Sequence, residues 1–391
     1  MDRNHLCLMT WNARSLKAKK LELVDFITNH VVDVGALTET HLKPGENFSL
    51  PDYTIVRFDR VDSRGGGVAI IVKKGIRFSI LPHLKTNVVE AIGVMIHTAT
   101  GGVRFIAAYC PRQCSANSGL AELFKSDLKI LTNSSSRFIL SGDFNARHSL
   151  WNNQRCNTNG TLLFHHYQSH QYEIAFPDNP TFLSSAGNPS TLDIIATNVR
   201  VSKPLVHNDL SSDHFPVVYT AQLSVEAAAI FKRKDFHNVD WIAFGRLVDN
   251  NISDEVPLET TTNIVCALDD LQRAITVADE TLIRQVPVRS KLLNIDSNTR
   301  YIIRLRNIYR RQFQRTGELG KKHAAALLTK VISFRLDAIK NKNFEREIRN
   351  LEDHSRPFWK IAKVLKSRPK PIPPFKAGDL VLITPSEKAL I

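Results

Sequence analysis

The chain has 391 residues, 43% hydrophobic and 23% charged, a globular composition at a length that favours two domains. It contains no apolar run near the ~18 residues of a transmembrane helix, and its N-terminus, MDRNHLCLMTW, lacks a secretory apolar segment with a small-residue cleavage site. The five cysteines are odd in number, scattered and without zinc-site spacing, which favours reduced thiols in a cytosolic or nuclear protein.

Positive charge is concentrated in the second half. Residues 1–225 hold 22 Lys and Arg against 18 Asp and Glu, a net +4, and residues 226–391 hold 30 against 20, a net +10, which together make the total of +14. An excess of this size favours polyanionic partners such as nucleic acid. Charge alone does not exclude a basic protein that has no such partner.

Short strands and a few helices are expected in the first half. Strands are predicted over 6–12, 31–38, 65–72, 88–96, 103–109, 137–140, 191–197 and 215–219, and helices over 15–30 and about 120–131. Ser15 is the expected N-cap of the first helix. Because strands outnumber helices and strict strand–helix–strand alternation is rare, the pattern predicts an α+β fold with antiparallel or mixed sheets.

Beyond about residue 225 the sequence becomes helical and basic. Residues 296–340 are the clearest part, with arginines expected on the faces left free by an apolar stripe of Ile302, Leu305, Ile308 and Phe313. Gly317 and Gly320 are expected to break this stretch into two helices. Residues 368–374 (RPKPIPP) indicate an extended linker. The chain is therefore expected to divide into 1–225, a basic helical connector over 226–367, and a linker over 368–391.

The stretch LSGDFNARHSLW (140–151) follows an apolar strand and places Asp143 and Asn145 two residues apart. Gly, Asp and Asn are common turn residues, and these residues alone favour a turn by about two to one. In an extended chain, however, residues i and i+2 point the same way, so a carboxylate and an amide would be aimed at one spot.

Five strand ends or loops of the first half carry residues suited to a metal ion and a phosphate. They are Asn12, Glu39, the pair Asp143 and Asn145, Asp193, and the pair Asp213 and His214. Each alone has an ordinary explanation as a turn residue, a solvated strand end or a structural histidine. Together they fit phosphodiester hydrolysis. Mg²⁺ needs only one or two carboxylates and acts as a Lewis acid, and a histidine held protonated by a carboxylate neutralises phosphoryl oxygens.

Seven motifs, taken in order, resemble the endonuclease–exonuclease–phosphatase superfamily, which includes DNase I and apurinic/apyrimidinic endonucleases. They are TWNARS (10–15), LTET (37–40), RGGGVAIIV (64–72), AYCP (108–111), SGDFNA (141–146), STLD (190–193) and SSDHFPV (211–217). Both in their residues and in their order, they are similar to the motifs of the endonuclease of jockey-type non-LTR retrotransposons, over roughly residues 5–222. The resemblance implies a four-layer α/β/β/α sandwich. It also implies a Mg²⁺-dependent endonuclease, with Mn²⁺ as a substitute, that nicks double-stranded target DNA and leaves a 3′-hydroxyl primer for reverse transcription.

The resemblance also implies roles for matching residues. Glu39 would bind the metal, Asn12 would support the metal and phosphate, and Asp213 would lie near the metal or the leaving group. Asp143 would position or deprotonate the attacking water, and Asn145 would orient it.

The remaining implied roles concern a histidine pair and the edge of the site. Asp193 would keep His214 oriented and charged, and Tyr109 would hydrogen-bond the phosphate. The tyrosine motif departs from the family pattern, because Pro111 is followed by Arg112 where two prolines are common. Trp151 is expected to serve packing rather than base stacking. Four further residues are candidate nucleic-acid contacts: Arg14, Arg147, Asn188 and Thr191.

Residues 226–391 resemble the region that connects this endonuclease to a reverse transcriptase, and TPSEKA (384–389) is similar to the stretch before the polymerase. No polymerase motif such as aromatic-Ala-Asp-Asp occurs, so we expect a chain truncated before the reverse transcriptase and without DNA synthesis. The basic helices have two open interpretations: a solvated linker whose apolar stripe packs on a polymerase domain, or a nonspecific clamp on DNA or element RNA. Nuclear action follows from the resemblance alone.

Two other functions remain as alternatives. One is an abasic-site repair endonuclease, or a small-substrate phosphatase, of the same superfamily. The retrotransposon-like motifs and the basic second half argue against it. The other is a decayed element product that only binds nucleic acid, against which the complete set of site residues argues.

Overall fold

The computed structural model describes residues 5–61, 65–111, 119–133, 135–183, 189–226, 232–252, 259–287, 295–349, 375–377 and 380–382. The chain separates into two compact units, Met1–Ser333 and Phe334–Ile391, and each is described by itself. None of the described helices combines the length and apolar character that crossing a membrane requires.

The first sheet brings Asn12 and Glu39 to one edge. It has six strands in the order β13-β14-β1-β2-β4-β3. The strands are β1 (Leu6–Asn12), β2 (Val34–Thr38), β3 (Tyr53–Phe58), β4 (Val68–Lys73), β13 (Leu205–Val206) and β14 (Val217–Ala221). β1 and β2 are parallel, with Asn12 opposite Thr38. Since parallel strands end at the same edge, Glu39 emerges beside Asn12.

The second sheet brings three more site residues to one edge. Its six strands follow the order β5-β6-β7-β8-β12-β9. They are β5 (Phe78–Ile80), β6 (Glu90–Thr98), β7 (Gly101–Tyr109), β8 (Phe138–Asp143), β9 (Glu173–Ala175) and β12 (Asp193–Thr197). Tyr109 lies opposite Asp143 in the parallel β7–β8 pair, and Asp143 lies opposite Asp193 in the antiparallel β8–β12 pair. The register therefore aligns Tyr109, Asp143 and Asp193.

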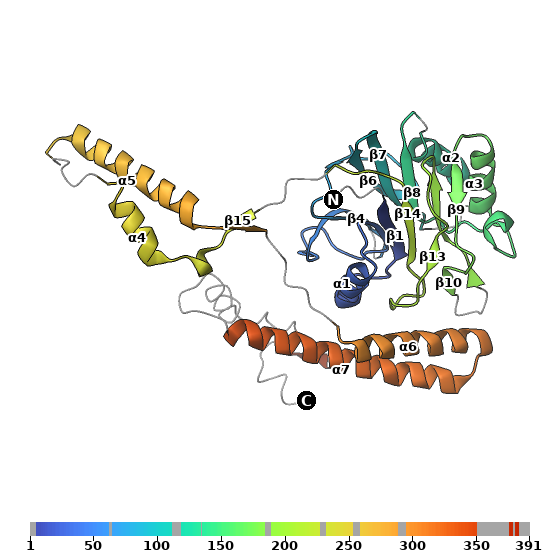
Figure 1. Ribbon diagram of the computed structural model, residues 1–391. Coiled ribbons are helices and arrows are strands. Elements are labelled where there is room, and N and C mark those ends of the chain that lie inside the picture. The colour runs from blue at the N-terminus through green and yellow to red at the C-terminus, as the bar shows by residue number, and fades with distance from the viewer. Residues whose placement is uncertain are drawn as a thin grey trace. The chain divides into compact units, whose positions relative to one another are not determined.

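The two sheets pack face to face through alternate residues of their strands (Figure 1). Leu8 of β1 and Ile70 of β4 meet Phe105 of β7 and Ile139 of β8 in one buried cluster. The residues between them point to the opposite faces, as the two-residue period of a strand requires. This central cluster forms the middle of the fold.

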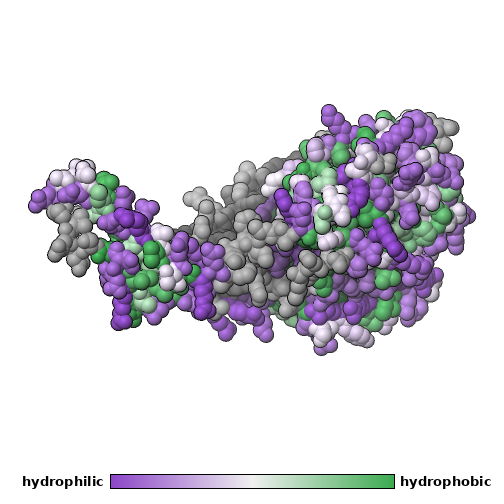
Figure 2. Space-filling model, turned by 45° about the horizontal axis from the view of Figure 1, so that its top comes forward, coloured by the Kyte–Doolittle hydropathy of each residue, from purple (hydrophilic) through white to green (hydrophobic). Residues whose placement is uncertain are grey.

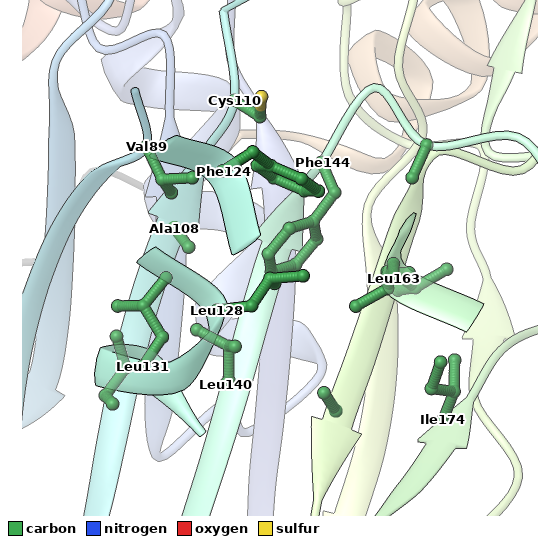
Figure 3. Close-up of a cluster of buried hydrophobic side chains, with 14 of the residues drawn as sticks. Val89, Ala108, Cys110, Phe124, Leu128, Leu131, Leu140, Phe144, Leu163 and Ile174 are labelled. Carbon is green, nitrogen blue, oxygen red and sulfur yellow. The ribbon is translucent and has the colours of Figure 1, made fainter. Parts of the chain in front are cut away.

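Helices cover both outer faces and complete four layers. Phe26 of α1 (Lys20–Asn29) packs on the outer face of the first sheet, together with Trp11. On the second sheet, Phe124 and Leu128 of α2 (Gly119–Leu131) lie against Leu140, and α3 (Thr158–Gln168) packs beside them (Figure 3). The predicted α/β/β/α sandwich is confirmed.

Several predicted element boundaries were wrong. The helix expected from Ser15 begins at Lys20, after a 3₁₀ turn over Lys17–Lys19. Ser15 is not its N-cap, because its φ of 82° is left-handed and its N–H donates to the carbonyl oxygen of Glu39. The second strand begins at Val34 rather than residue 31, because Val31 has a φ of 51°. α3 and the shorter strands, including β10 (Phe182–Leu183) and β11 (Pro189–Ser190), were not predicted.

The connector contains a helical pair closed by a small two-stranded sheet. β15 (Lys232–Lys234) pairs with β16 (Gln285–Pro287). Between them lie a 3₁₀ turn (Phe236–Asn238), α4 (Trp241–Asp249) and α5 (Thr261–Leu282). α5 exposes Val265 and Leu268 among other apolar residues, and Figure 2 shows hydrophobic side chains on the surface of this helical pair.

Two more helices follow, α6 (Ser297–Thr316) and α7 (Leu319–Arg349). Gly317 ends α6 in the left-handed conformation, as predicted, whereas Gly320 lies inside the first turn of α7 and breaks nothing. Arg306 is buried, which corrects the expectation that arginines take the solvated faces. Residues 368–374 and 384–389 lie outside the described residues. β17 (Phe375–Ala377) pairs with β18 (Leu380–Leu382) in the antiparallel direction.

Candidate active site

Asn12 joins the two sheets at the edge where the site residues converge. Its side-chain nitrogen Nδ2 donates to Oε1 of Glu39 at 2.9 Å and to Oδ2 of Asp143 at 2.9 Å. Its Oδ1 accepts from the N–H of Arg14 at 3.2 Å. The residues predicted from separate strand ends are thus brought within hydrogen-bonding distance across the sandwich.

Glu39 is held as a carboxylate by two donors. Besides Asn12, the hydroxyl of Tyr109 donates to Oε1 at 2.8 Å. Burial would raise the pKa of Glu39, but these two hydrogen bonds, together with the charges of His214 and Arg14, outweigh it and hold the pKa below its ordinary value. Burial and the nearby Glu39 carboxylate raise the pKa of Tyr109, so its hydroxyl stays a donor.

His214 lies between two carboxylates. Its Nδ1 is 2.7 Å from Oδ2 of Asp193, and its Nε2 is 3.7 Å from Oδ2 of Asp143. Burial would lower the pKa of His214, but the charges of Asp193 and Asp143 outweigh it and raise the pKa to about 9. The imidazole is therefore positively charged at neutral pH, and the bond to Asp193 fixes its orientation.

Asp143 is fully enclosed at the end of β8. Burial raises the pKa of its carboxyl above the ordinary value, a shift that suits a proton acceptor. The preceding Gly142 is required here, because a Cβ at that position would stand 1.8 Å from the carbonyl oxygen of Ala108 in β7. The close approach of these two parallel strands therefore fixes where Asp143 leaves the sheet.

Asn145 shows that both interpretations of the GDFN stretch hold in part. Its N–H donates to Oδ1 of Asp143 at 2.9 Å, which is the local turn bond expected of an Asp. Its φ of 47° is left-handed, so the extended geometry assumed for Asp143 and Asn145 was wrong. Its Nδ2 donates to the carbonyl oxygen of Cys110 at 2.7 Å. The turn thus ties the end of β8 to the end of β7.

Arg14 covers the outer side of the site. Its guanidinium forms an ion pair with Asp213, and its Nε lies 3.8 Å from Oε2 of Glu39. Arg14 and Glu39 have φ values of 42° and 47°, conformations that are costly for residues with a Cβ. Such outliers cluster at functional sites, where surrounding contacts hold them in place.

The other predicted nucleic-acid contacts differ in exposure. Arg147 is half-buried, and its Nε has no hydrogen-bond partner in the described part of the chain. Thr191 is fully buried and offers no surface to a nucleic acid. Asn188 lies outside the described residues, as does Arg112. Trp151 is fully buried and its indole donates to the carbonyl oxygen of Ala146 at 3.0 Å, which confirms the packing role.

Three supporting residues were missed by sequence reasoning. The Nε2 of His41 lies 3.3 Å from Oε2 of Glu39. The indole of Trp11 donates to the carbonyl oxygen of His214 at 3.2 Å. Thr181 accepts from the N–H of Asp193 at 3.1 Å. Trp11 lies within the motif TWNARS and His41 directly follows the motif LTET, so both could have been found from the motifs. Thr181 lies outside every motif, and the sequence carried no signal for it.

The site carries more negative than positive charge. Four carboxylates converge here, and the basic side chains beside them are Arg14, His41 and His214. The four are Glu39, Asp143, Asp193 and Asp213. An excess of buried carboxylate oxygens is the donor chemistry that a hard divalent cation prefers.

Two sets of residues could hold such an ion. The ligand atoms of Asp143, Asp193 and His214 lie within 4.8 Å of one another. In that set the Asp193–His214 contact is a hydrogen bond of 2.7 Å, which orients the imidazole. Oε2 of Glu39 accepts from neither Asn12 nor Tyr109 and has the Nε2 of His41 at 3.3 Å, so the predicted set around Glu39 also offers an oxygen that could bind an ion.

Comparison with known proteins supports the motif assignment. The family model described as "Endonuclease-reverse transcriptase" matches residues 103–218. RNA-directed DNA polymerases from mobile element jockey are similar along most of the chain. The Drosophila funebris protein is 28% identical over 378 residues, covering 92% of this chain and 40% of that protein. The Drosophila melanogaster protein is 28% identical over 386 residues, covering 95% and 41%.

Solved structures similar to the chain include two nuclease domains. The endonuclease domain of TRAS1, a telomere-specific non-LTR retrotransposon, has 19% identity and a TM-score of 0.47, covering 56% of this chain and 99% of that one. The catalytic domain of Xenopus laevis APE2 has 16% identity and a TM-score of 0.46, covering 57% and 94%.

The chain spans about two fifths of the length of its jockey relatives, and the matched part contains the site described above. The ordered motifs, the family model and the jockey relatives agree on one assignment. Together they support an endonuclease of the endonuclease–exonuclease–phosphatase superfamily, similar to those of jockey-type non-LTR retrotransposons.

Proposed function

We propose that the chain is a Mg²⁺-dependent DNA endonuclease that nicks one strand of a duplex and leaves a 3′-hydroxyl. The observation that carries the proposal is the convergence of Asn12, Glu39 and Asp143 with the His214–Asp193 pair at one edge of the sandwich. A charged imidazole, an enclosed carboxylate and a metal-binding carboxylate are the groups that phosphodiester hydrolysis requires.

Mg²⁺, or Mn²⁺ in its place, would be held by Glu39, with Asn12 and Asp213 beside it. The oxygen-rich donor set, with carboxylates from Glu39 and Asp213, fits a hard cation. When bound, the ion supplies Lewis-acid stabilisation of the charge on the phosphate.

The chain's own residues supply proton transfer and orientation. Asp143 accepts a proton from water, whose oxygen bonds to phosphorus while the bond from phosphorus to O3′ breaks. The departing O3′ takes up a proton from solvent water and becomes the 3′-hydroxyl, and the other product carries a 5′-phosphate. His214, kept charged and oriented by Asp193, neutralises a phosphoryl oxygen. Tyr109 donates a hydrogen bond to the phosphate, and Asn145 orients it.

We further propose that the nick serves target-primed reverse transcription in the nucleus. The jockey relatives are named as RNA-directed DNA polymerases, an activity that needs a 3′-hydroxyl primer. Double-stranded DNA is the substrate of this site. The net +10 of residues 226–391 supports contact between the connector and the phosphates of DNA or of element RNA.

Nicking of supercoiled plasmid tests the proposal. The full chain should convert supercoils to open circles with Mg²⁺ and not with EDTA, and a DNA polymerase should extend the nicks. Asp143→Ala should lower the rate by at least ~10²-fold, because it removes the proton acceptor. Asp178→Ala, at an exposed aspartate paired with Lys203, is the matched control and should nick at the wild-type rate.

Other outcomes would redirect the assignment. Binding of DNA without metal-dependent nicking would identify a binding-only relic. A strong preference for abasic duplex over intact duplex would identify a repair endonuclease. Nicking that persists in Asp143→Ala would place the active site elsewhere.

A further inference from the structure

The buried face of α6 is polar. Thr299, Ile303, Arg306 and Asn307 are nearly inaccessible, and of the six arginines of the helix only Arg304 and Arg315 are exposed. Their spacing of four, three and one residues places them on one side of the helix. Since buried polar groups need partners, this face requires hydrogen-bond acceptors from whatever it packs against.

Three acidic residues of the endonuclease region form ion pairs with arginines of α6. The Nε of Arg300 lies 2.9 Å from both carboxylate oxygens of Asp25 in α1. Arg304 is paired with Asp209, and Nη1 of Arg306 lies 3.8 Å from Oε1 of Glu22. We call these six residues the docking cluster: Glu22, Asp25, Asp209, Arg300, Arg304 and Arg306. It joins α6 to α1 and to the loop that follows β13 (Figure 1).

Farther along, α6 contacts that loop directly. Nδ2 of Asn307 donates to the carbonyl oxygens of Asn208 at 2.7 Å and Leu210 at 3.2 Å. The guanidinium of Arg311 lies 3.8 Å from the ring centroid of Phe215, a cation–π contact. α6 therefore contacts the loop on both sides of Asp213 and His214.

The loop depends on such contacts because it has little regular structure of its own. It spans residues 207–216 between the short strand β13 and β14. The sandwich bonds mainly to its second half: the N–H of Leu183 donates to the carbonyl oxygen of Asp213 at 3.2 Å, the N–H of Phe215 donates to the carbonyl oxygen of Thr181 at 2.7 Å, and the indole of Trp11 donates to His214. In the first half, the N–H of Ser211 donates to Glu22 and α6 bonds to the carbonyl oxygens of Asn208 and Leu210. A displacement of about 1 Å at a reacting group costs up to ~10²-fold in rate.

We propose that α6 belongs to the catalytic unit, with Asn307 acting as a positioning residue for the Asp213–His214 loop. The inference rests on the catalytic role proposed for that loop. Asn307 suits the role because it is uncharged, almost fully buried and bonded to two main-chain carbonyls of the loop. Its contribution can therefore be separated from any attraction between arginines and DNA.

Asn307→Ala in the full chain tests the proposal. Asn298→Ala, in the exposed first turn of the same helix, is the matched control. Two quantities would be measured in each variant: kcat and KM for plasmid nicking, and amide hydrogen exchange in peptides covering 207–215. Asn307→Ala should lower kcat by about 10-fold and leave KM within about twofold. It should also speed exchange in the loop, while Asn298→Ala matches wild type in both.

The contrary results are distinct. Equal kcat and equal exchange in the two variants would overturn the proposal, as would faster exchange with unchanged kcat. A raised KM with unchanged kcat would mean that α6 acts through DNA binding instead. Complete absence of nicking by the wild type would remove the proposed function. Exchange in 207–215 would then still decide whether Asn307 holds the loop, with equal exchange overturning the positioning role.

Discussion

Two polar clusters of this molecule are built from similar residues and differ in the ratio of acidic to basic side chains. In the docking cluster three carboxylates meet three arginines. At the active site four carboxylates lie beside Arg14, His41 and His214. When a cluster has equal numbers of acidic and basic side chains, their charges neutralise one another and hold two elements together. An unbalanced set stores repulsion that a cationic ligand relieves. Charge balance thus distinguishes a cluster that holds the fold from one prepared for chemistry.

The largest expected effect is at the active site. Asp193→Asn keeps the size of the side chain but removes the charge that orients His214 and raises its pKa. We expect nicking to fall at least ~10²-fold, together with a loss of stability, because His214 would stay buried without its nearest carboxylate. Plasmid nicking and thermal unfolding measured together check this, with Asp178→Asn as the control. A rate within threefold of wild type, a margin set by roughly 0.6 kcal/mol, would remove His214 from the mechanism.

Breaking the docking cluster should affect stability instead. Glu22→Leu leaves Arg306 buried without its carboxylate and removes the acceptor of the Ser211 N–H. The loss should be about 3 kcal/mol in the free energy of unfolding, as for other broken buried pairs. Denaturant titration measures it, and Glu122→Leu, at an exposed glutamate, is the control. An unchanged midpoint would mean that the cluster does not hold α6.

Removing the Asp143 carboxylate from the active site should raise the free energy of unfolding, which is the opposite of the effect expected for Glu22→Leu. Asp143→Asn removes a fully enclosed charge that lies among other carboxylates, and its amide can still accept from Asn12. In EDTA we expect the unfolding free energy to rise by about 1 kcal/mol while nicking is lost. Thermal unfolding decides the sign. A decrease in stability would contradict the idea of stored repulsion.

The smallest effect concerns acid pH. Burial would raise the pKa of Asp209, but hydrogen bonds from His30 and Arg304 outweigh it and lower the pKa to about 2. Because the folded pKa is depressed, the stabilisation is present above the unfolded value near 4 and is lost as pH falls towards 2. Arg304 is largely exposed, so we expect only about 1 kcal/mol after solvent screening. The unfolding free energies of wild type and Asp209→Asn should become equal as the pH falls from 4 to 2, a window fixed by these pKa values.

The sequence was sufficient to predict that residues from separate strand ends serve one site. Asn12, Glu39 and Asp143 each follow an apolar run and suit a metal ion and a phosphate, but the pairing of the strands was not predicted. The order of the motifs, through the family resemblance, then predicted the sandwich fold. It could not supply local backbone conformation, because Ser15 and Asn145 adopt left-handed φ values that tertiary hydrogen bonds stabilise.

The place of α6 could not be predicted for a different reason. The apolar spacing of Ile302, Leu305 and Ile308 correctly indicated a helix, yet Ile308 is exposed and the inaccessible face carries Arg306 and Asn307. Their partners lie about 100 residues away or farther along the chain, as for Asn307 and Asn208. No local pattern of hydrophobicity records a docking face made of ion pairs. The domain boundary predicted at residue 225 stays a prediction.

The return of the chain at α6 has a consequence for how the protein could be divided. After β14 the chain passes through α4 and α5 before α6 bonds back to α1 and to the Asp213–His214 loop. Residues 232–287 are therefore an insertion whose two ends are both anchored. A protease cut between α4 and α5 would leave two fragments held together by the docking cluster. The endonuclease should accordingly reassemble from separately expressed halves, with the second fragment restoring the first as a split enzyme.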